Sequence, residues 1–147
     1  MKKINYFFAF LILFLSPSCF SQQLVKTVND AQKIKANEEQ FINKPLKELL
    51  KEIKPPIKHV SASPSKNIQS NVGYFIFNFV DSNQKESLRS KGKTPVTLVV
   101  YVKEYFEWDF QKRPKGKETV WTSEDEKKYE NLTIVGFRVY GNATAPN

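Results

Sequence analysis

Residues 72–80 read Val-Gly-Tyr-Phe-Ile-Phe-Asn-Phe-Val. Because side chains along a strand alternate between its two faces, this order places three phenylalanines on one face and Tyr74 and Ile76 on the other. Aromatic and β-branched residues favour strands. The stretch therefore predicts a strand whose phenylalanine face lies against a covering layer.

Two further strands are predicted downstream. The first follows Pro95 and covers residues 96–102, where Val, Leu, Val and Val alternate with Thr, Val and Tyr. The second covers residues 132–140, and its alternation places Ile134 and Phe137 on opposite faces. More than ten residues separate each strand from the next, which excludes two-residue hairpins.

Two helices are predicted before the first strand. Residues 24–37 carry apolar side chains at helical spacing, and Thr27-x-x-Asp30 is typical of a capping box. Residues 46–53 carry a clearer apolar face, with leucine at 46, 49 and 50 and isoleucine at 53. Pro45 suits the first turn of a helix, and Pro55-Pro56 prevents its continuation.

This order of elements predicts an α+β fold, in which two N-terminal helices pack on an antiparallel sheet of three to four strands as a two-layer sandwich. Residues 57–71 are rich in Ser, Pro, Asn and Lys, so we expect a surface loop there. Residues 22–147 then form one domain, which ends in a flexible tail over 141–147.

The first 21 residues have the pattern of a secretory signal peptide. Lys2 and Lys3 are followed by ten apolar residues from Tyr6 to Leu15, far fewer than the roughly 20 that span a bilayer. Small residues at positions 19 and 21 suit cleavage before Gln22. We therefore expect an exported protein, periplasmic or extracellular, with no transmembrane span in the mature chain.

Cys19 offers an alternative, in which a lipobox is acylated and anchors the chain to the outer membrane. Ser16 and Pro17 stand where lipoprotein signals carry an aliphatic and a small residue, so plain cleavage is favoured. Cys19 is the single cysteine, and the mature fold is therefore predicted to lack disulfides. Cleavage removes Lys2 and Lys3 from 23 basic residues and leaves all 15 acidic ones, which gives a mature net charge of +6.

Aromatic and charged residues are concentrated after the second predicted strand. The alternation continues to Phe110, and Arg113-Pro-Lys-Gly116 favours a turn before a short return strand over 118–122. This pattern predicts a hairpin arm that projects beyond the sheet and binds a partner. The candidate binding residues are Tyr105, Phe106, Trp108, Phe110, Lys112, Arg113 and Trp121. In the alternative, the aromatic side chains of this arm extend the core under the helices.

Few residues suit catalysis or metal binding. His59 is the only histidine, no cysteine pair exists, and no Gly-x-Ser-x-Gly elbow is present. Glu104, Glu107 and Asp109 come closest to a catalytic carboxylate pair, but neighbouring basic residues would lower their pKa values, whereas a general acid needs a raised one. We therefore expect a non-enzymatic protein with no metal or cofactor.

Basic residues suggest an anionic partner in only one place. Lysines at 44, 47, 51 and 54 recur at helical spacing and could meet an anionic surface. The alternative is an ordinary solvated helix face, diluted by Glu48 and Glu52. Nucleic acid is not an expected partner, because 20 of the 23 basic residues are lysine and base recognition depends on arginine.

The signal peptide, the element order and the segment Lys44-Pro-Leu-x-x-Leu-Leu50 together resemble small envelope proteins of Gram-negative bacteria. These are the outer-membrane assembly small lipoproteins and the β-lactamase-inhibitor-like domains. Residues 41–50 are also similar to a segment that recurs in uncharacterised secreted proteins of these bacteria. The resemblance implies two helices packed on an antiparallel sheet and a non-catalytic role in protein binding.

We therefore predict a secreted or periplasmic non-enzymatic module that binds an envelope protein through one sheet face and the aromatic arm. The first alternative is a glycan-binding or glycan-cleaving envelope domain that uses Trp108, Trp121 and the nearby carboxylates. The second is a purely structural envelope component.

Overall fold

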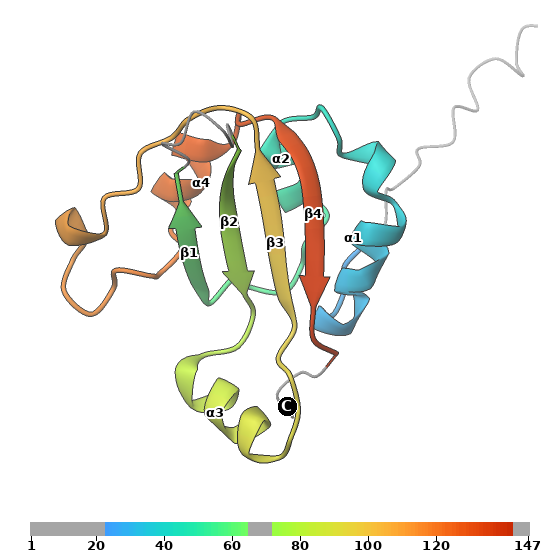
Figure 1. Ribbon diagram of the computed structural model, residues 1–147, viewed down its shortest axis with the longest axis vertical. Helices are drawn as coiled ribbons and strands as arrows, with labels where there is room; N and C mark the ends of the chain where they lie inside the picture. The colour runs from blue at the N-terminus through green and yellow to red at the C-terminus, as the bar shows by residue number, and fades with distance from the viewer. Residues whose placement is uncertain (1–22, 65–71, 143–147) are drawn as a thin grey trace, which may run out of the picture.

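Four strands form one antiparallel sheet in the order β1-β2-β3-β4 (Figure 1). Their bounds are β1 His59–Ser63, β2 Gly73–Asn78, β3 Thr97–Val102 and β4 Ile134–Tyr140. This computed structural model describes residues 23–64 and 72–142. The predicted signal peptide, the lipidation alternative at Cys19 and most of the predicted tail lie outside the described residues.

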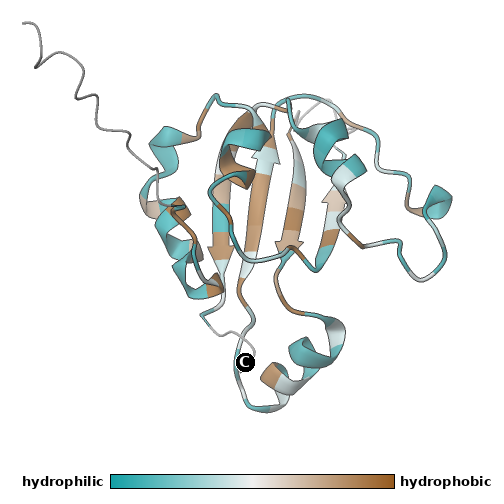
Figure 2. Ribbon diagram, turned by 180° about the vertical axis from the view of Figure 1, so that it is seen from behind, coloured by the Kyte–Doolittle hydropathy of each residue, from teal (hydrophilic) through white to brown (hydrophobic). Residues whose placement is uncertain are grey.

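The helices are short and gather mainly on one side of the sheet. In chain order they are η1 Val28–Ala31, α1 Gln32–Ala36, η2 Glu38–Gln40, α2 Leu46–Leu50, α3 Ser82–Ser90, η3 Phe110–Lys112 and α4 Ser123–Tyr129, where η marks a 3-10 helix. Figure 2 shows α2 and α4 in front of the strands, α1 beside β4, and α3 beyond one end of the sheet. The predicted α+β arrangement, with N-terminal helices packed on an antiparallel sheet, is thus confirmed.

The core lies between the sheet and α2 and α4. Phe75 and Phe77 of β2 are fully buried, as are Leu46 and Leu49 of α2, and all four belong to one apolar cluster. Burial of large apolar side chains is the main stabilising contribution to such a domain. The alternation read in residues 72–80 therefore identified the buried face of the central strands correctly.

The predicted helices are shorter than their apolar patterns. Residues 24–37 divide into η1 and α1, and the Thr27–Asp30 capping box is present, with the Thr27 amide donating to the Asp30 carboxylate over 2.9 Å. The second helix ends at Leu50, because the following residues pair with the N-terminal segment. The amide of Val25 donates to the Glu52 carbonyl, and the amide of Lys54 donates to the Val25 carbonyl, both over 2.9 Å.

The prediction of a surface loop over residues 57–71 was wrong for residues 59–63, and its part over 65–71 lies outside the described residues. Residues His59–Ser63 form β1, an edge strand in which Val60 is fully buried and Ser61 is exposed. The strand is stabilised by pairing with β2, in which Val60 lies opposite Phe77. Serine favours turns only where no neighbouring strand takes its backbone hydrogen bonds.

The last strand contains an irregularity that alternation alone does not reveal. Val102 of β3 pairs with Ile134, whereas Tyr101 pairs with Gly136, so Val135 is an extra residue in β4. A bulge of this kind reverses the alternation, and Ile134 and Phe137 are therefore both buried, contrary to the prediction that they face opposite sides.

Candidate binding surface

Residues 103–122 do not form the predicted projecting hairpin. Strand β3 ends at Val102, and no strand occurs over 118–122. Two residues after the end of β3, the Glu104 carboxylate binds Thr133. It accepts from the backbone amide of Thr133 over 2.6 Å and from its hydroxyl over 2.5 Å. Further along, the carbonyl of Thr119 accepts from the Val60 amide over 2.7 Å, so this segment runs along the outer edge of β1.

Three aromatic side chains of this segment, those of Phe106, Trp108 and Trp121, belong to the core, and we call them the aromatic cluster. Phe106 is 5 % exposed and stacks on Phe75 with ring centroids 4.4 Å apart. Trp108 and Trp121 meet Phe75 edge-on at 6.2 and 5.9 Å, and both are partly buried. Of the two interpretations left open by the sequence, the structure favours the extended core, and the two tryptophans do not form an exposed flat platform for a sugar.

Arg113 is held inside the same cluster. Its guanidinium donates to both carboxylate oxygens of Asp125 at 2.8 Å and to the carbonyl of Val120 at 2.6 Å. It also lies 4.3 Å from the centre of the Trp108 ring. A guanidinium with this many partners is a structural link between the segment and α4, and it is not available to a binding partner.

Three of the seven candidate residues remain at the surface. Tyr105 and Phe110 are 55 % and 52 % exposed. Lys112 forms an exposed ion pair with Asp109 at 2.8 Å, which raises the pKa of the lysine. The structure thus separates the candidate residues into a buried group and a few isolated exposed side chains, and it does not bring them together as one binding site.

Two of the three carboxylates considered for catalysis, those of Asp109 and Glu104, are engaged by neighbouring side chains. An ion pair with Lys112 lowers the pKa of Asp109. Burial opposes ionisation of Glu104, but hydrogen bonds from Thr133 outweigh it and lower the pKa of Glu104. Nδ1 of His59 lies 3.1 Å from the Thr119 hydroxyl. In the part of the chain that the structure describes, no group of three or more His, Cys, Asp or Glu side chains could hold a metal ion.

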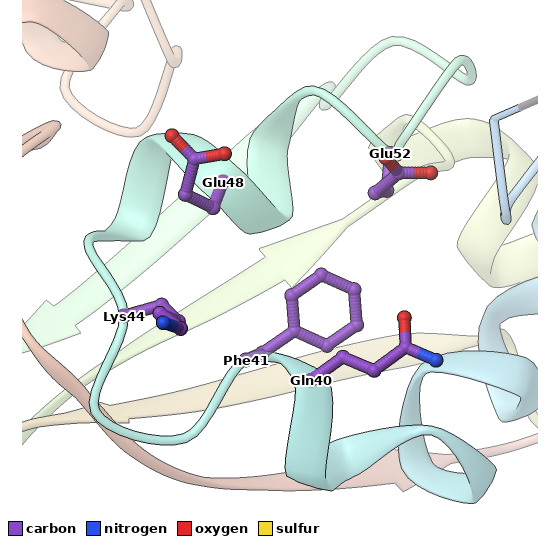
Figure 3. A pocket seen from close by; sticks show the side chains of 5 residues that line it. All are labelled: Gln40, Phe41, Lys44, Glu48 and Glu52. Atoms are coloured by element: carbon purple, nitrogen blue, oxygen red, sulfur yellow. The ribbon is translucent and has the colours of Figure 1, made fainter. Parts of the chain in front are cut away.

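Two of the four lysines at positions 44, 47, 51 and 54, which we call the lysine stripe, are engaged by other side chains. Lys51 forms an ion pair with Glu48 at 2.9 Å, and Lys47 donates to the side chain of Asn131. A hollow of about 300 Å³ beside the stripe is lined by Gln40, Phe41, Lys44, Glu48 and Glu52 (Figure 3). Both carboxylates of this hollow already have a partner, because Glu52 accepts from the Leu24 amide and Glu48 accepts from Lys51. This arrangement favours the alternative of a solvated face.

Within residues 23–64 and 72–142, no helix covers one of the two faces of the sheet. In Figure 1 the four strands lie in front of α2 and α4, and in Figure 2 they lie behind them. The strand register brings large side chains together on this uncovered face, since Ile76 is opposite Val99, which is opposite Arg138, and Tyr74 is opposite Tyr101. We call these five residues and Tyr140 the uncovered sheet face.

The side chains of the uncovered sheet face touch one another. The rings of Tyr74 and Tyr101 are 5.9 Å apart, and the Arg138 guanidinium lies 5.7 Å from the centre of the Tyr101 ring. Arg138 also approaches the Tyr140 hydroxyl at 3.5 Å, and this contact together with both phenols raises the pKa of the arginine. Tyr140 is 48 % exposed, whereas Val99 between the larger side chains is 7 % exposed.

The uncovered sheet face combines the residue types that dominate protein interfaces. Tyrosine and arginine remove much area from water on binding and retain a polar group, and they are enriched among hot-spot residues. The sequence analysis placed Tyr74 and Ile76 opposite the phenylalanines but did not select them as a site. The alternating pattern contained this signal in all three predicted strands.

Comparisons with known proteins identify no relative. No protein-family model matches the chain. Neither a search of curated proteins nor a search of solved structures returned a match. The resemblance to small envelope proteins therefore stays a prediction. Among the described helices, none is long and apolar enough to cross a bilayer.

Proposed function

We propose that the chain is an exported, non-enzymatic module that binds another protein of the cell envelope through the uncovered sheet face. The observation that carries the proposal is the cluster of Tyr74, Tyr101 and Arg138 on a sheet face that no described helix covers. A two-layer α+β domain buries one face of its sheet, and the other face is usually polar. Here the second face presents three tyrosines and two aliphatic side chains beside polar residues such as Ser61, Asn78 and Thr97.

A protein partner fits this face better than a glycan. Its residues come from three adjacent strands and form one continuous patch. Its one charged residue is Arg138, and the mature chain is expected to be basic, so the partner should present acidic residues around an apolar centre. The tryptophans that suggested sugar stacking are engaged in the core.

The test is site-specific photo-crosslinking in the cells that produce the protein. A photoreactive phenylalanine analogue at position 101 should crosslink to one discrete protein, which mass spectrometry then identifies. The same analogue at position 105 is the matched control, because Tyr105 is an exposed tyrosine outside the face. Equal crosslinking from both positions, or none from position 101, would contradict the proposal.

The identified protein then allows a quantitative test of the face. Tyr101→Ala and Arg138→Glu should each weaken its binding at least thirtyfold, because truncation of a hot-spot residue costs about 2 kcal/mol or more. Tyr105→Ala should leave the affinity unchanged. Both face variants should keep the melting temperature within a few degrees, since Arg138 is exposed and Tyr101 lies outside the buried core.

A further inference from the structure

A second surface feature lies at the end of the sheet that carries α3. A hollow of about 280 Å³ is lined by Lys85, Arg89, Lys93, Thr94, Pro95, Thr97 and Tyr140. Three of these residues are cationic and none is acidic. Figure 1 shows α3 beyond the end of β2 and β3. The hollow shares Tyr140 with the uncovered sheet face, but Tyr74, Tyr101 and Arg138 do not line it.

The helix that supplies the cations is fixed at both ends. At its start, the Asp81 carboxylate accepts from the Gln84 amide over 2.8 Å and the Gln84 side chain accepts from the Asp81 amide, which forms a capping box. At its end, Gly92 has φ +68°, and the Lys93 amide donates to the Leu88 carbonyl over 2.9 Å. This is a Schellman motif, which places Lys93 beside the last turn.

The three cations face the same hollow without a neutralising group. Lys85 and Arg89 are four residues apart and therefore lie on one side of α3. In the ranges 23–64 and 72–142, no carboxylate forms an ion pair with Lys85, Arg89 or Lys93. By contrast, Lys33, Lys35, Lys51 and Lys112 each have an acidic partner. Like charges held close together repel one another, so a bound anion would relieve this repulsion.

Lys85 is the central residue of this cluster. It is half-buried, and it lines two adjoining hollows in addition to the cationic one. Of the three hollows that Lys85 lines, the two neighbouring ones contain an acidic residue and the cationic one contains none. Asp81 is engaged as the helix cap, and Glu86 follows Lys85 in the chain. The cationic hollow itself offers donors from three charged side chains and from the hydroxyls of Thr94 and Tyr140, whereas the Thr97 hydroxyl donates to Asn78.

We propose that this hollow binds the phosphomonoester group of a ligand. A phosphomonoester carries nearly two negative charges at neutral pH and three strong acceptor oxygens, which matches three cationic donors better than a single carboxylate does. Lysine binds phosphate as a point charge, and Arg89 adds a planar pair of donors. The group could belong to a soluble sugar phosphate or to the headgroup of an anionic lipid.

Two probes distinguish these sources. Binding of glucose 1-phosphate to the purified protein is measured by calorimetry, and binding of vesicles that contain phosphatidic acid in phosphatidylcholine is measured by co-flotation, both at 0.15 M salt. Glucose and pure phosphatidylcholine vesicles are the uncharged controls. Saturable binding of glucose 1-phosphate indicates a soluble ligand, and binding of the anionic vesicles alone indicates a lipid headgroup.

A matched pair of variants assigns the binding to this hollow. Lys85→Gln with Arg89→Gln should weaken binding at least tenfold, because each removed cation contributes a charge-assisted hydrogen bond. Lys115→Gln with Lys117→Gln removes the same charge from an exposed turn and should change the affinity less than twofold. Melting curves of both variants verify that the fold is retained.

Four outcomes would overturn the proposal. The first is that neither glucose 1-phosphate nor the anionic vesicles bind, and the second is an equal loss of binding in the two double variants. The third is binding that survives Lys85→Gln with Arg89→Gln, and the fourth is tighter binding of a hexaglutamate peptide than of both phosphate probes. None of these outcomes bears on the uncovered sheet face, because its test uses positions 101 and 138.

Discussion

Removal of the Arg113–Asp125 ion pair tests whether residues 103–122, which we call the aromatic segment, are a structural part of the core. The pair is bidentate and its side chains are 16 % and 9 % exposed. The same carboxylate accepts from the amide and the hydroxyl of Thr122, both over 2.9 Å, at the start of α4. The variant Asp125→Asn keeps the size of the side chain and removes its charge.

The expected loss follows from these contacts. Breaking a buried pair by removing one partner costs about 3–5 kcal/mol, and a hydrogen bond to a charged group contributes about 1.5–3 kcal/mol. Because the guanidinium is partly exposed and keeps its bond to the Val120 carbonyl, the loss should lie near the lower value, about 3 kcal/mol. For a domain of this size, such a change lowers the melting temperature by about 10 °C.

Urea unfolding followed by tryptophan fluorescence measures this loss directly. Both tryptophans of the chain, Trp108 and Trp121, lie in the aromatic cluster, so their emission reports on the segment that the ion pair holds. Asp109→Asn is the matched control, because Asp109 forms an ion pair that is exposed to solvent and should contribute little. A change in the free energy of unfolding below about 0.5 kcal/mol for Asp125→Asn would refute the reasoning.

The pH dependence gives a second, independent readout. Burial alone would raise the pKa of Asp125, but hydrogen bonds from Arg113 and Thr122 outweigh it and lower the pKa below its usual value. A carboxylate with a lowered folded-state pKa stabilises the protein fully above the unfolded value of about 3.9, and this contribution is lost as the pH falls through the folded value. The difference in stability between the natural chain and Asp125→Asn should therefore be constant near neutral pH and decline below about pH 4.

Three further variants test the fold around the proposed sites. Trp108→Ala should destabilise the protein by about 2–3 kcal/mol in chemical unfolding, because the ring packs on the core, whereas Tyr105→Ala should change it by less than about 0.5 kcal/mol. Gly141→Ala should be far more destabilising than Gly116→Ala. Both glycines have positive φ, but only at Gly141 would an added Cβ clash with the Pro95 carbonyl oxygen. Melting temperatures of the two variants test this order. Asp81→Ala removes the N-cap of α3 and should lower the stability of the helix by about 1 kcal/mol. The loss is measured as faster amide hydrogen exchange in residues 82–90.

The local patterns of the sequence were sufficient for the buried faces of the central strands. In residues 72–80 and 96–102 a strand has period two and one side faces the core, so Phe75, Phe77, Leu98 and Val100 could be identified before any tertiary information. Strand β1 was missed because only Val60 and Ala62 face inward and serines surround them. Its strand conformation is determined by pairing with β2, which a local pattern does not contain.

The aromatic segment shows where local reasoning ends. Continued alternation after Val102 suggested a longer strand, but a strand also needs a partner for its backbone groups. Glu104 is instead bound by Thr133, which lies 29 residues later in the chain. The role of Arg113 depends in the same way on Asp125, across a separation of 12 residues. A weak signal existed in the capping box formed by Thr122 and Asp125, because it places a carboxylate at a defined helix start.

The position of α4 determines which surface remains for binding. Its residue Tyr129 is 3 % exposed, and it contacts Phe75, Trp108 and Trp121 from the same side of the sheet as α2. The helix and the aromatic segment therefore complete one layer, and in the part of the chain that the structure describes no helix lies over the opposite face. Had α4 crossed to the other side, Tyr74 and Tyr101 would be core residues and Trp108 would be exposed. Both tryptophans and Arg113, which the sequence suggested for binding, are thus structural, and the proposed binding surface is the sheet face that this layer does not cover.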